Sequence, residues 1–169
     1  MDRHVRDAFL LLLTDAVELA SMSNRGWAIE YALDPSEEVK LAAVTDCGYA
    51  NKYIKNQSEE VQLAAVTLNG PAIQWVKDPS EAVQIAAVTQ YSWAIQYIID
   101  PSEAVKLVAV TRFGHAIKFI PDPSEAIQLA AVTHDGWAIK WVKNPSEKIK
   151  LAAVTQNGNL IKWLRLEAQ

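Results

Sequence analysis

The chain has 169 residues, of which 50% are apolar and 21% charged, and its formal net charge is −4. This balance is typical of a soluble globular protein with one core, and the acidity weighs against a nucleic-acid binder, which usually carries a net basic surface. The only cysteine is Cys47, so an internal disulfide is excluded and an oxidising compartment is not indicated.

The N-terminal segment contains a short apolar run, residues 8–13. The run is too short to cross a membrane and, with acids close by, makes a poor signal peptide. We expect residues 1–12 to form a capping helix that continues into the first repeat, and we expect a cytoplasmic protein without a membrane partner.

From residue 13 onward the chain repeats a 22-residue pattern seven times without insertion, and residues 167–169 form a tail. A typical unit is PSEAVQIAAVTQYSWAIQYIID, residues 79–100. One such unit cannot bury its apolar surface alone, whereas stacked units can. The units begin at residues 13, 35, 57, 79, 101, 123 and 145.

Each unit reads as two short helices. The junction Asp34-Pro35-Ser36-Glu37 predicts a helix start in which Asp caps, Pro fills the first turn and Glu completes a capping box. The helix that follows should run for about three turns, and its nearly continuous apolar circumference predicts burial between neighbours. A glycine at unit position 14 should end it in the left-handed conformation, and a second helix of about two turns should follow, such as Trp137 to Val142.

These features together predict an all-α fold. The expected architecture is an α-solenoid of seven 22-residue helical hairpins, wound as a right-handed superhelix and forming a single domain.

The unit PSEEVQLAAVTLNGPAIQWVKD resembles two families of short bacterial helical repeats. One is an uncharacterised family with motifs of the "vlAAVkqnGwAlqya" kind, found in bacterial, phage and large-virus proteins, and the other is the leucine-rich variant repeat, which is HEAT-like. The resemblance covers residues 13–166. It implies a scaffold from a bacterium or a phage-infected cell and does not indicate a particular activity. The cysteine-rich iron–sulfur module known in the second family is ruled out by the single cysteine.

Variation among the units concentrates at positions 12, 13 and 15, which are candidate partner-binding positions because large aromatic residues exposed on a rigid scaffold are frequent hot spots. For the position-15 residues, packing over the turn of their own unit is an equally good interpretation. The candidate residues are Trp27, Tyr49, Tyr91, Trp93, Arg112, Phe113, His115, His134 and Trp137.

His134 and Asp135 stand side by side, but no such pair recurs in the other units. Consecutive helical residues also point about 100° apart, so we interpret the pair as surface variation and not as a catalytic pair. The three histidines lack the spacing of a zinc site, and the single glycines do not form a phosphate-binding loop. We therefore expect no enzymatic activity, no catalytic residues, no metal and no cofactor.

Position 19 is aromatic in every unit. We interpret this ladder as core between the second helices, with a stacking platform for bases or a ligand as the alternative. The residues are Tyr31, Tyr53, Trp75, Tyr97, Phe119, Trp141 and Trp163.

Charge is also sorted by position. Thirteen of the twenty acids lie at positions 22, 3 and 4, and eight of the sixteen basic residues lie at positions 18 and 21, an arrangement that offsets helix dipoles. Stacking would also draw part of the bases into a row, with Lys52, Lys118, Lys140 and Lys162 as its candidates. We predict a non-enzymatic scaffold for a protein partner, with an inhibitor of host defence as a narrower case and a nucleic-acid-binding or nucleic-acid-mimicking protein as the alternative.

Overall fold

The structure is a computed structural model that describes residues 25–167, and within that range it is entirely helical, with no strand. Pairs of helices recur about every 22 residues, so the predicted all-α solenoid of helical repeats is confirmed. The predicted capping helix, residues 1–12, lies outside the described residues, and the hand of the superhelix stays a prediction.

Two kinds of helix alternate along the chain. Each α-helix in the middle of the chain has ten residues and each following 3₁₀ helix has six. The α-helices are α2 (Glu37–Asp46), α3 (Glu59–Leu68), α4 (Glu81–Gln90), α5 (Glu103–Arg112), α6 (Glu125–His134), α7 (Glu147–Gln156) and α8 (Leu160–Glu167). The 3₁₀ helices are η1 (Gly26–Tyr31), η2 (Gly48–Tyr53), η3 (Gly70–Trp75), η4 (Ser92–Tyr97), η5 (Gly114–Phe119) and η6 (Gly136–Trp141).

The second helix of a repeat has the predicted two turns but a tighter hydrogen-bond pattern. The N–H of Ala116 donates to the carbonyl of Phe113 at 2.8 Å, and that of Ile120 donates to Ile117 at 3.0 Å. Bonds to the third residue back define a 3₁₀ helix, in which six residues make two turns. Only the last repeat departs from this among the described ones, because its second helix is the α-helix α8.

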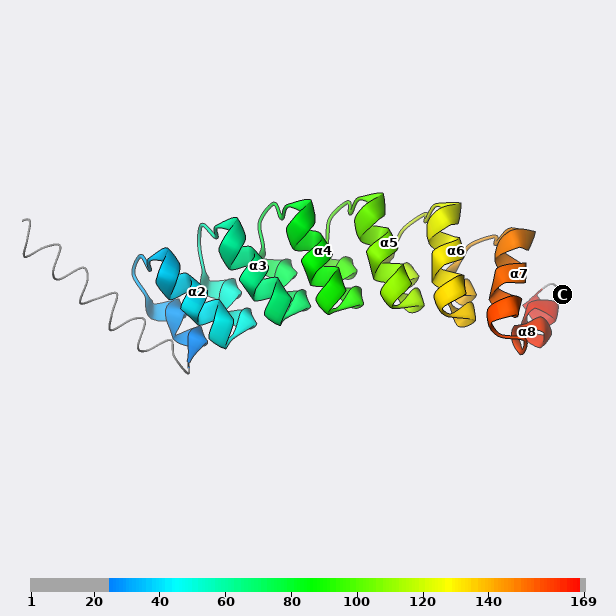
Figure 1. Cartoon of the computed structure of the whole chain (residues 1–169), viewed down its shortest axis with the longest axis horizontal. Coiled ribbons are helices and arrows are strands. Elements are labelled where there is room, and N and C mark those ends of the chain that lie inside the picture. The colour runs from blue at the N-terminus through cyan, green and yellow to red at the C-terminus, as the bar shows by residue number, and fades with distance from the viewer. Residues whose placement is uncertain (1–24, 168–169) are drawn as a thin grey trace, which may run out of the picture. The chain divides into compact units, whose positions relative to one another are not determined.

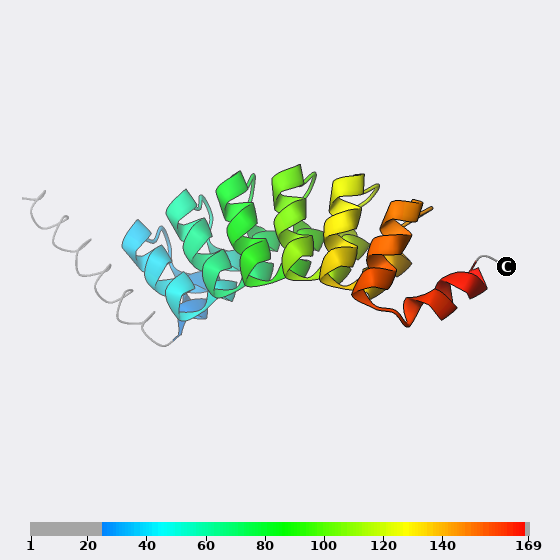
Figure 2. The ribbon, with the colours of Figure 1, turned by 45° about the vertical axis from the view of Figure 1, so that its right-hand side comes forward.

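The contacts group the chain into two compact units, one that ends at Ala86 and one that begins at Ala87, so the division falls inside α4. In the second unit α5, α6 and α7 pack side by side, and η4, η5 and η6 form a second layer against them (Figure 1, Figure 2). In the first unit α2 and α3 pack in the same manner and carry η1, η2 and η3.

The core of each repeat is built from a few fixed positions. In the fifth repeat Val105, Ala109 and Val110 of the α-helix are fully buried, together with Ala116 and Ile117 of the 3₁₀ helix. The nearly continuous apolar circumference of the α-helices predicts burial on all sides, but the structure leaves one side exposed. Leu107 and Leu151, at position 7, are 43% and 68% exposed, because neighbouring α-helices cover only the flanks of each helix.

The helix start differs from the predicted capping box. Ser124 is the N-cap, and its Oγ accepts from the N–H of Ile127 at 3.3 Å. Glu125 is then the first helical residue and cannot close a box. Asp122 adopts the left-handed backbone conformation with φ 46°. Short polar side chains tolerate this region better than other non-glycine residues, and all six junction residues use it: Asp34, Asn56, Asp78, Asp100, Asp122 and Asn144.

The position-14 glycines do not form the predicted left-handed turn, since no described glycine has a positive φ. Instead they allow the backbone of the next repeat to come close. A Cβ placed on Gly136 would lie 2.6 Å from the carbonyl oxygen of Ala153 in the next repeat. At Gly158 a Cβ would meet nothing within 4 Å. In most repeats the glycine therefore leaves room for the α-helix of the following repeat, although the fourth repeat accommodates Ser92 at this position.

Polar bonds tie one repeat to the next at the helix starts. The Ser124 hydroxyl donates to Glu103 Oε2 at 2.9 Å, and the Ser146 hydroxyl donates to Glu125 Oε1 at 3.3 Å. The N-cap serine of one repeat thus also binds the first helical glutamate of the repeat before it.

Candidate partner-binding surface

The position-19 rings do not form the continuous buried ladder that the sequence predicts. Tyr31, Tyr53, Tyr97 and Trp141 are exposed, whereas Trp75, Phe119 and Trp163 are partly buried, and Trp75 packs against the core of the first unit. Tyr97 and Trp141 are 41% and 43% exposed. Positions 16, 17 and 20 of each repeat, such as Ala116, Ile117 and Ile120, already fill the space beside the α-helices. The larger ring at position 19 is therefore left partly outside, where it forms part of a surface.

Rings at position 15 contact rings at position 19 of the next repeat. In the first unit the centroids of Tyr49 and Trp75 lie 5.3 Å apart. In the second unit Trp93 lies 5.7 Å from Phe119 and Trp137 lies 6.3 Å from Trp163. These edge-on contacts are the favoured geometry of aromatic pairs, and each one bridges two consecutive repeats.

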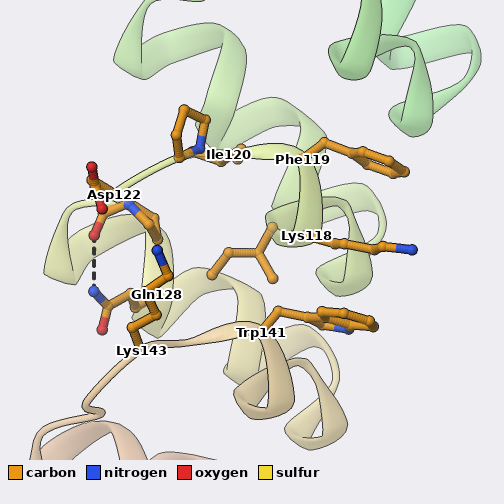
Figure 3. A pocket seen from close by; sticks show the side chains of 10 residues that line it. Lys118, Phe119, Ile120, Asp122, Gln128, Trp141 and Lys143 are labelled. Atoms are coloured by element: carbon orange, nitrogen blue, oxygen red, sulfur yellow. Dashed lines mark hydrogen bonds between the residues drawn. The ribbon is translucent and has the colours of Figure 1, made fainter.

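Lysines at position 18 lie between these rings. The Lys118 ammonium lies 5.6 Å from the centroid of Phe119 and 4.9 Å from that of Trp141, in the next repeat. Figure 3 shows the Lys118 side chain between the two rings, with all three projecting in one direction. The Lys140 ammonium lies 4.3 Å from Trp137 and 5.9 Å from Trp163. Both distance pairs are within the range of cation–π attraction.

A second group of rings adjoins these. Tyr91 and Phe113 flank Trp93 at centroid distances of 6.3 and 5.7 Å, and His115 follows Phe113 at 5.5 Å. Arg112 lines a shallow pocket with the first three of these rings. We call the combined set the ring-lysine surface: Tyr91, Trp93, Phe113, Lys118, Phe119, Trp137, Lys140, Trp141 and Trp163.

The structure therefore brings together four predicted residues of the second unit, Tyr91, Trp93, Arg112 and Phe113. Trp93 continues this group to Phe119 and Lys118, whereas the partly buried Trp137 contacts Trp163 and Lys140. Lys162 is exposed on α8. In the first unit, Trp27 and Tyr49 are each about half exposed, and Lys52 lies 5.4 Å from the Tyr53 ring.

His134 has a structural task that the sequence interpretation missed. Its Nδ1 accepts a hydrogen bond from the N–H of Gly114, in the preceding repeat, at 3.2 Å. Asp46 and Gln156, at the same position 12, accept from Gly26 and Gly136. The recurrence of acceptor side chains at position 12 was the available signal. His134 thus belongs to a tie between repeats.

Asp135 contacts residues other than those that His134 contacts. Its Oδ1 accepts from the N–H of Trp137 at 2.9 Å, and its Oδ2 lies 3.1 Å from Nδ1 of His115. The neighbours His134 and Asp135 therefore make different contacts, and the contact of Asp135 with His115 joins two repeats. Within residues 25–167, no group of three or more His, Cys, Asp or Glu side chains could hold a metal ion.

Glu37 and Glu103 have a pKa below the ordinary value of a glutamate. Hydrogen bonds from Lys40 and then Ser58 lower the pKa of Glu37, and hydrogen bonds from Ser124 and then Lys106 lower the pKa of Glu103. Bonding to the charged form has this effect on a carboxyl group. Because both groups belong to the ties at helix starts, their shifts do not mark a catalytic site.

A cavity of about 630 Å³ lies beside the ring-lysine surface (Figure 3). Lys118, Trp141, Lys143 and Gln128 line it, and Gln128 Nε2 donates to the Pro123 carbonyl at 2.8 Å. Cavities in the same register occur at residues 29–56 and 139–164. The cavity is therefore one of at least three that recur at equivalent repeat junctions.

No family model, no curated protein and no solved structure matches the chain. The resemblance to short helical repeat families, and the phage or bacterial origin and host-defence role that were inferred with it, stay predictions. Among the described residues, no helix is long and apolar enough to span a membrane.

Proposed function

We propose that this protein is a non-enzymatic scaffold that binds a macromolecular partner through its exposed short-helix positions, chiefly the ring-lysine surface. The observation that carries the proposal is the exposure of large rings from consecutive repeats, joined by ring–ring and ring–lysine contacts. Monomeric proteins rarely leave a contiguous aromatic area exposed unless something binds there.

The scaffold suits this task because its rings are held in place. Trp93, Phe119, Trp137 and Trp141 stand on two-turn helices in which neighbouring residues, such as Ala116 and Ile117, are fully buried. Contacts such as Trp93 with Phe119 restrict the rings further. A surface ordered before binding loses less conformational entropy when it binds. Rings of this kind provide binding energy toward proteins and nucleic acids alike.

The test is capture of partners from a lysate by three tagged proteins: the parent chain, the variant Trp93→Ala/Trp137→Ala, and the variant Leu107→Ala/Leu151→Ala. The last variant removes apolar side chains that are exposed on α5 and α7 instead. We expect the first variant to lose the partner and the second to keep it. Circular dichroism verifies that all three remain folded.

A partner that depends on Leu107 and Leu151 and is indifferent to the rings would place the binding surface on the α-helices and overturn the assignment. Turnover of a small molecule by the purified protein itself would contradict a purely binding function.

A further inference from the structure

The short-helix layer of the second unit is basic, although the whole chain is acidic. Residues 92–99, 114–121, 136–143 and 158–166 contain no Asp or Glu. Most acids of this unit lie at the helix starts and junctions. The two exceptions are Asp135, which His115 and the Trp137 N–H engage, and Glu167, the last residue of α8. The basic residues of these segments are Lys118, Lys140, Lys143, Lys162 and Arg165.

The lysines among the rings are free to meet an anion. Within the described residues, the ion pairs of lysine involve Lys40, Lys106, Lys148 and Lys150, all on α-helices. Lys118 and Lys140 contact rings and not carboxylates. Each ammonium can therefore bind an anion without first breaking an ion pair.

We infer that the ring-lysine surface binds single-stranded nucleic acid, an inference that rests on the function proposed above. Ring faces and ammonium groups alternate along it, in the order Phe119, Lys118, Trp141 in Figure 3. A single strand presents the matching alternation of flat bases and phosphates. Non-specific single-strand binding combines these two elements, a basic track and aromatic side chains for stacking.

The chemistry favours this partner over a protein and over a duplex. Lysine is depleted in the centre of protein–protein interfaces, where arginine is the enriched cation, yet Lys118 and Lys140 stand among the rings. A duplex keeps its base faces stacked inside, so it would use the lysines and leave the rings without a role. The net charge of −4 does not oppose the inference, because local fields act within a Debye length of about 10 Å.

Fluorescence anisotropy with labelled oligouridylate, oligodeoxythymidylate and a duplex of equal length, at about 50 and 200 mM salt, tests the inference. We expect both single strands to bind more tightly than the duplex. Trp141→Ala should weaken single-strand binding roughly 5-fold to 150-fold, the range for one stacked base. Lys118→Gln/Lys140→Gln should lower the slope of log K against log salt by about 1.4, for two phosphates at about 0.7 each.

Matched control variants distinguish binding by the ring-lysine surface from an effect of losing any exposed charge or apolar side chain. Lys148→Gln removes an exposed lysine of α7, and Leu151→Ala removes an exposed apolar side chain of the same helix. Both should bind as the parent does. Trp141→Phe keeps a ring and should restore most of the affinity.

Absence of single-strand binding at low salt, equal affinity for the duplex, or equal losses in the Lys148→Gln control would each overturn the inference. If a protein partner that survives nuclease is captured through the rings while no oligonucleotide binds, the proposed binding function stands and only the partner class fails. If both experiments are negative, both proposals fall.

Discussion

The imidazole of His134 accepts a hydrogen bond from the backbone N–H of Gly114, twenty residues earlier, at 3.2 Å. The glycine begins η5 and the histidine ends α6, so the bond joins the last turn of one α-helix to the 3₁₀ helix of the preceding repeat. The interaction requires an acceptor at position 12 and does not require a charge.

Replacement of His134 should follow this requirement. His134→Leu should lower the free energy of unfolding by about 1 kcal/mol, because the glycine N–H loses its acceptor. His134→Gln should be close to neutral, since Gln156 makes the same bond to Gly136 at 2.8 Å. Urea denaturation measures both. Equal destabilisation by the two substitutions would show that the hydrogen bond is not the stabilising contact.

The position-14 glycines offer a paired test of close approach. Gly136→Ala should destabilise the protein by about 1–3 kcal/mol, as overpacking does, because the new Cβ would meet the Ala153 carbonyl oxygen at 2.6 Å. Gly158→Ala should be neutral or stabilising by up to about 1 kcal/mol, since nothing lies within 4 Å and the unfolded chain loses freedom. Thermal unfolding of the two variants should therefore shift in different directions or by clearly different amounts.

The left-handed junction residues should tolerate glycine better than alanine. Asp122 has φ 46°, a conformation that costs about 1–2 kcal/mol for an ordinary side chain. Asp122→Ala should lower stability by about that amount, whereas Asp122→Asn and Asp122→Gly should cost less. Chemical denaturation of the three variants checks the order, and an alanine variant as stable as the glycine variant would contradict it.

Asn51 is a polar residue in the core of the second repeat. It is fully buried, and neither polar atom of its amide has a hydrogen-bond partner. Other repeats place isoleucine here, such as Ile73 and Ile117. Burial of an unpaired amide costs about 1–3 kcal/mol, so Asn51→Ile should raise the free energy of unfolding by a similar amount. An unchanged or lowered midpoint in urea would show that the amide is paired after all, for example by a bound water molecule.

Acid should weaken the ties at the helix starts. The pKa values of Glu37 and Glu103 are lowered in the folded protein from the ordinary 4.5, so the unfolded state takes up these protons first as the pH falls. Their contribution to stability is thus fully present above the unfolded value of 4.5 and is lost as the pH falls through the folded values. Glu37→Gln/Glu103→Gln should be less stable than the parent near neutral pH and should approach it in acid. A difference that does not depend on pH would refute this assignment.

The sequence contains enough information for the repeat and its helix pairs because buried positions recur every 22 residues. Two details escape it for physical reasons. Asp34 and Ser36 are both good N-caps, and the hydrogen bond from the Val39 N–H to the Ser36 Oγ, at 3.4 Å, shows that the serine is the cap. Six residues such as Gly114–Phe119 carry too few apolar positions to distinguish an α from a 3₁₀ helix.

The surface was predicted in part. Variation pointed correctly to Tyr91, Trp93 and Phe113 as exposed residues. The exposure of Tyr97 and Trp141 departs from the predicted core ladder, because a position that is aromatic in every repeat has the same signature whether it fills a core or lines a surface. The ring of Trp141 is kept outside by Ile139 and Val142, which occupy the core on either side of it, and that competition for space cannot be seen in a list of residue types.

The ties between repeats span only 20 to 22 residues of chain, as Ser124 with Glu103 and Gly114 with His134 show. The helix-start tie recurs along the chain, as Ser80 with Glu59 and Ser146 with Glu125 also show, whereas Leu68 and Arg112 at position 12 offer no side-chain acceptor for the second tie. A gene segment for 22 residues can therefore be duplicated or deleted in register, and each remaining repeat still finds its partners. Such an event would add or remove one set of short-helix side chains. If the proposed binding function holds, the number of repeats therefore sets how long a partner the surface can contact.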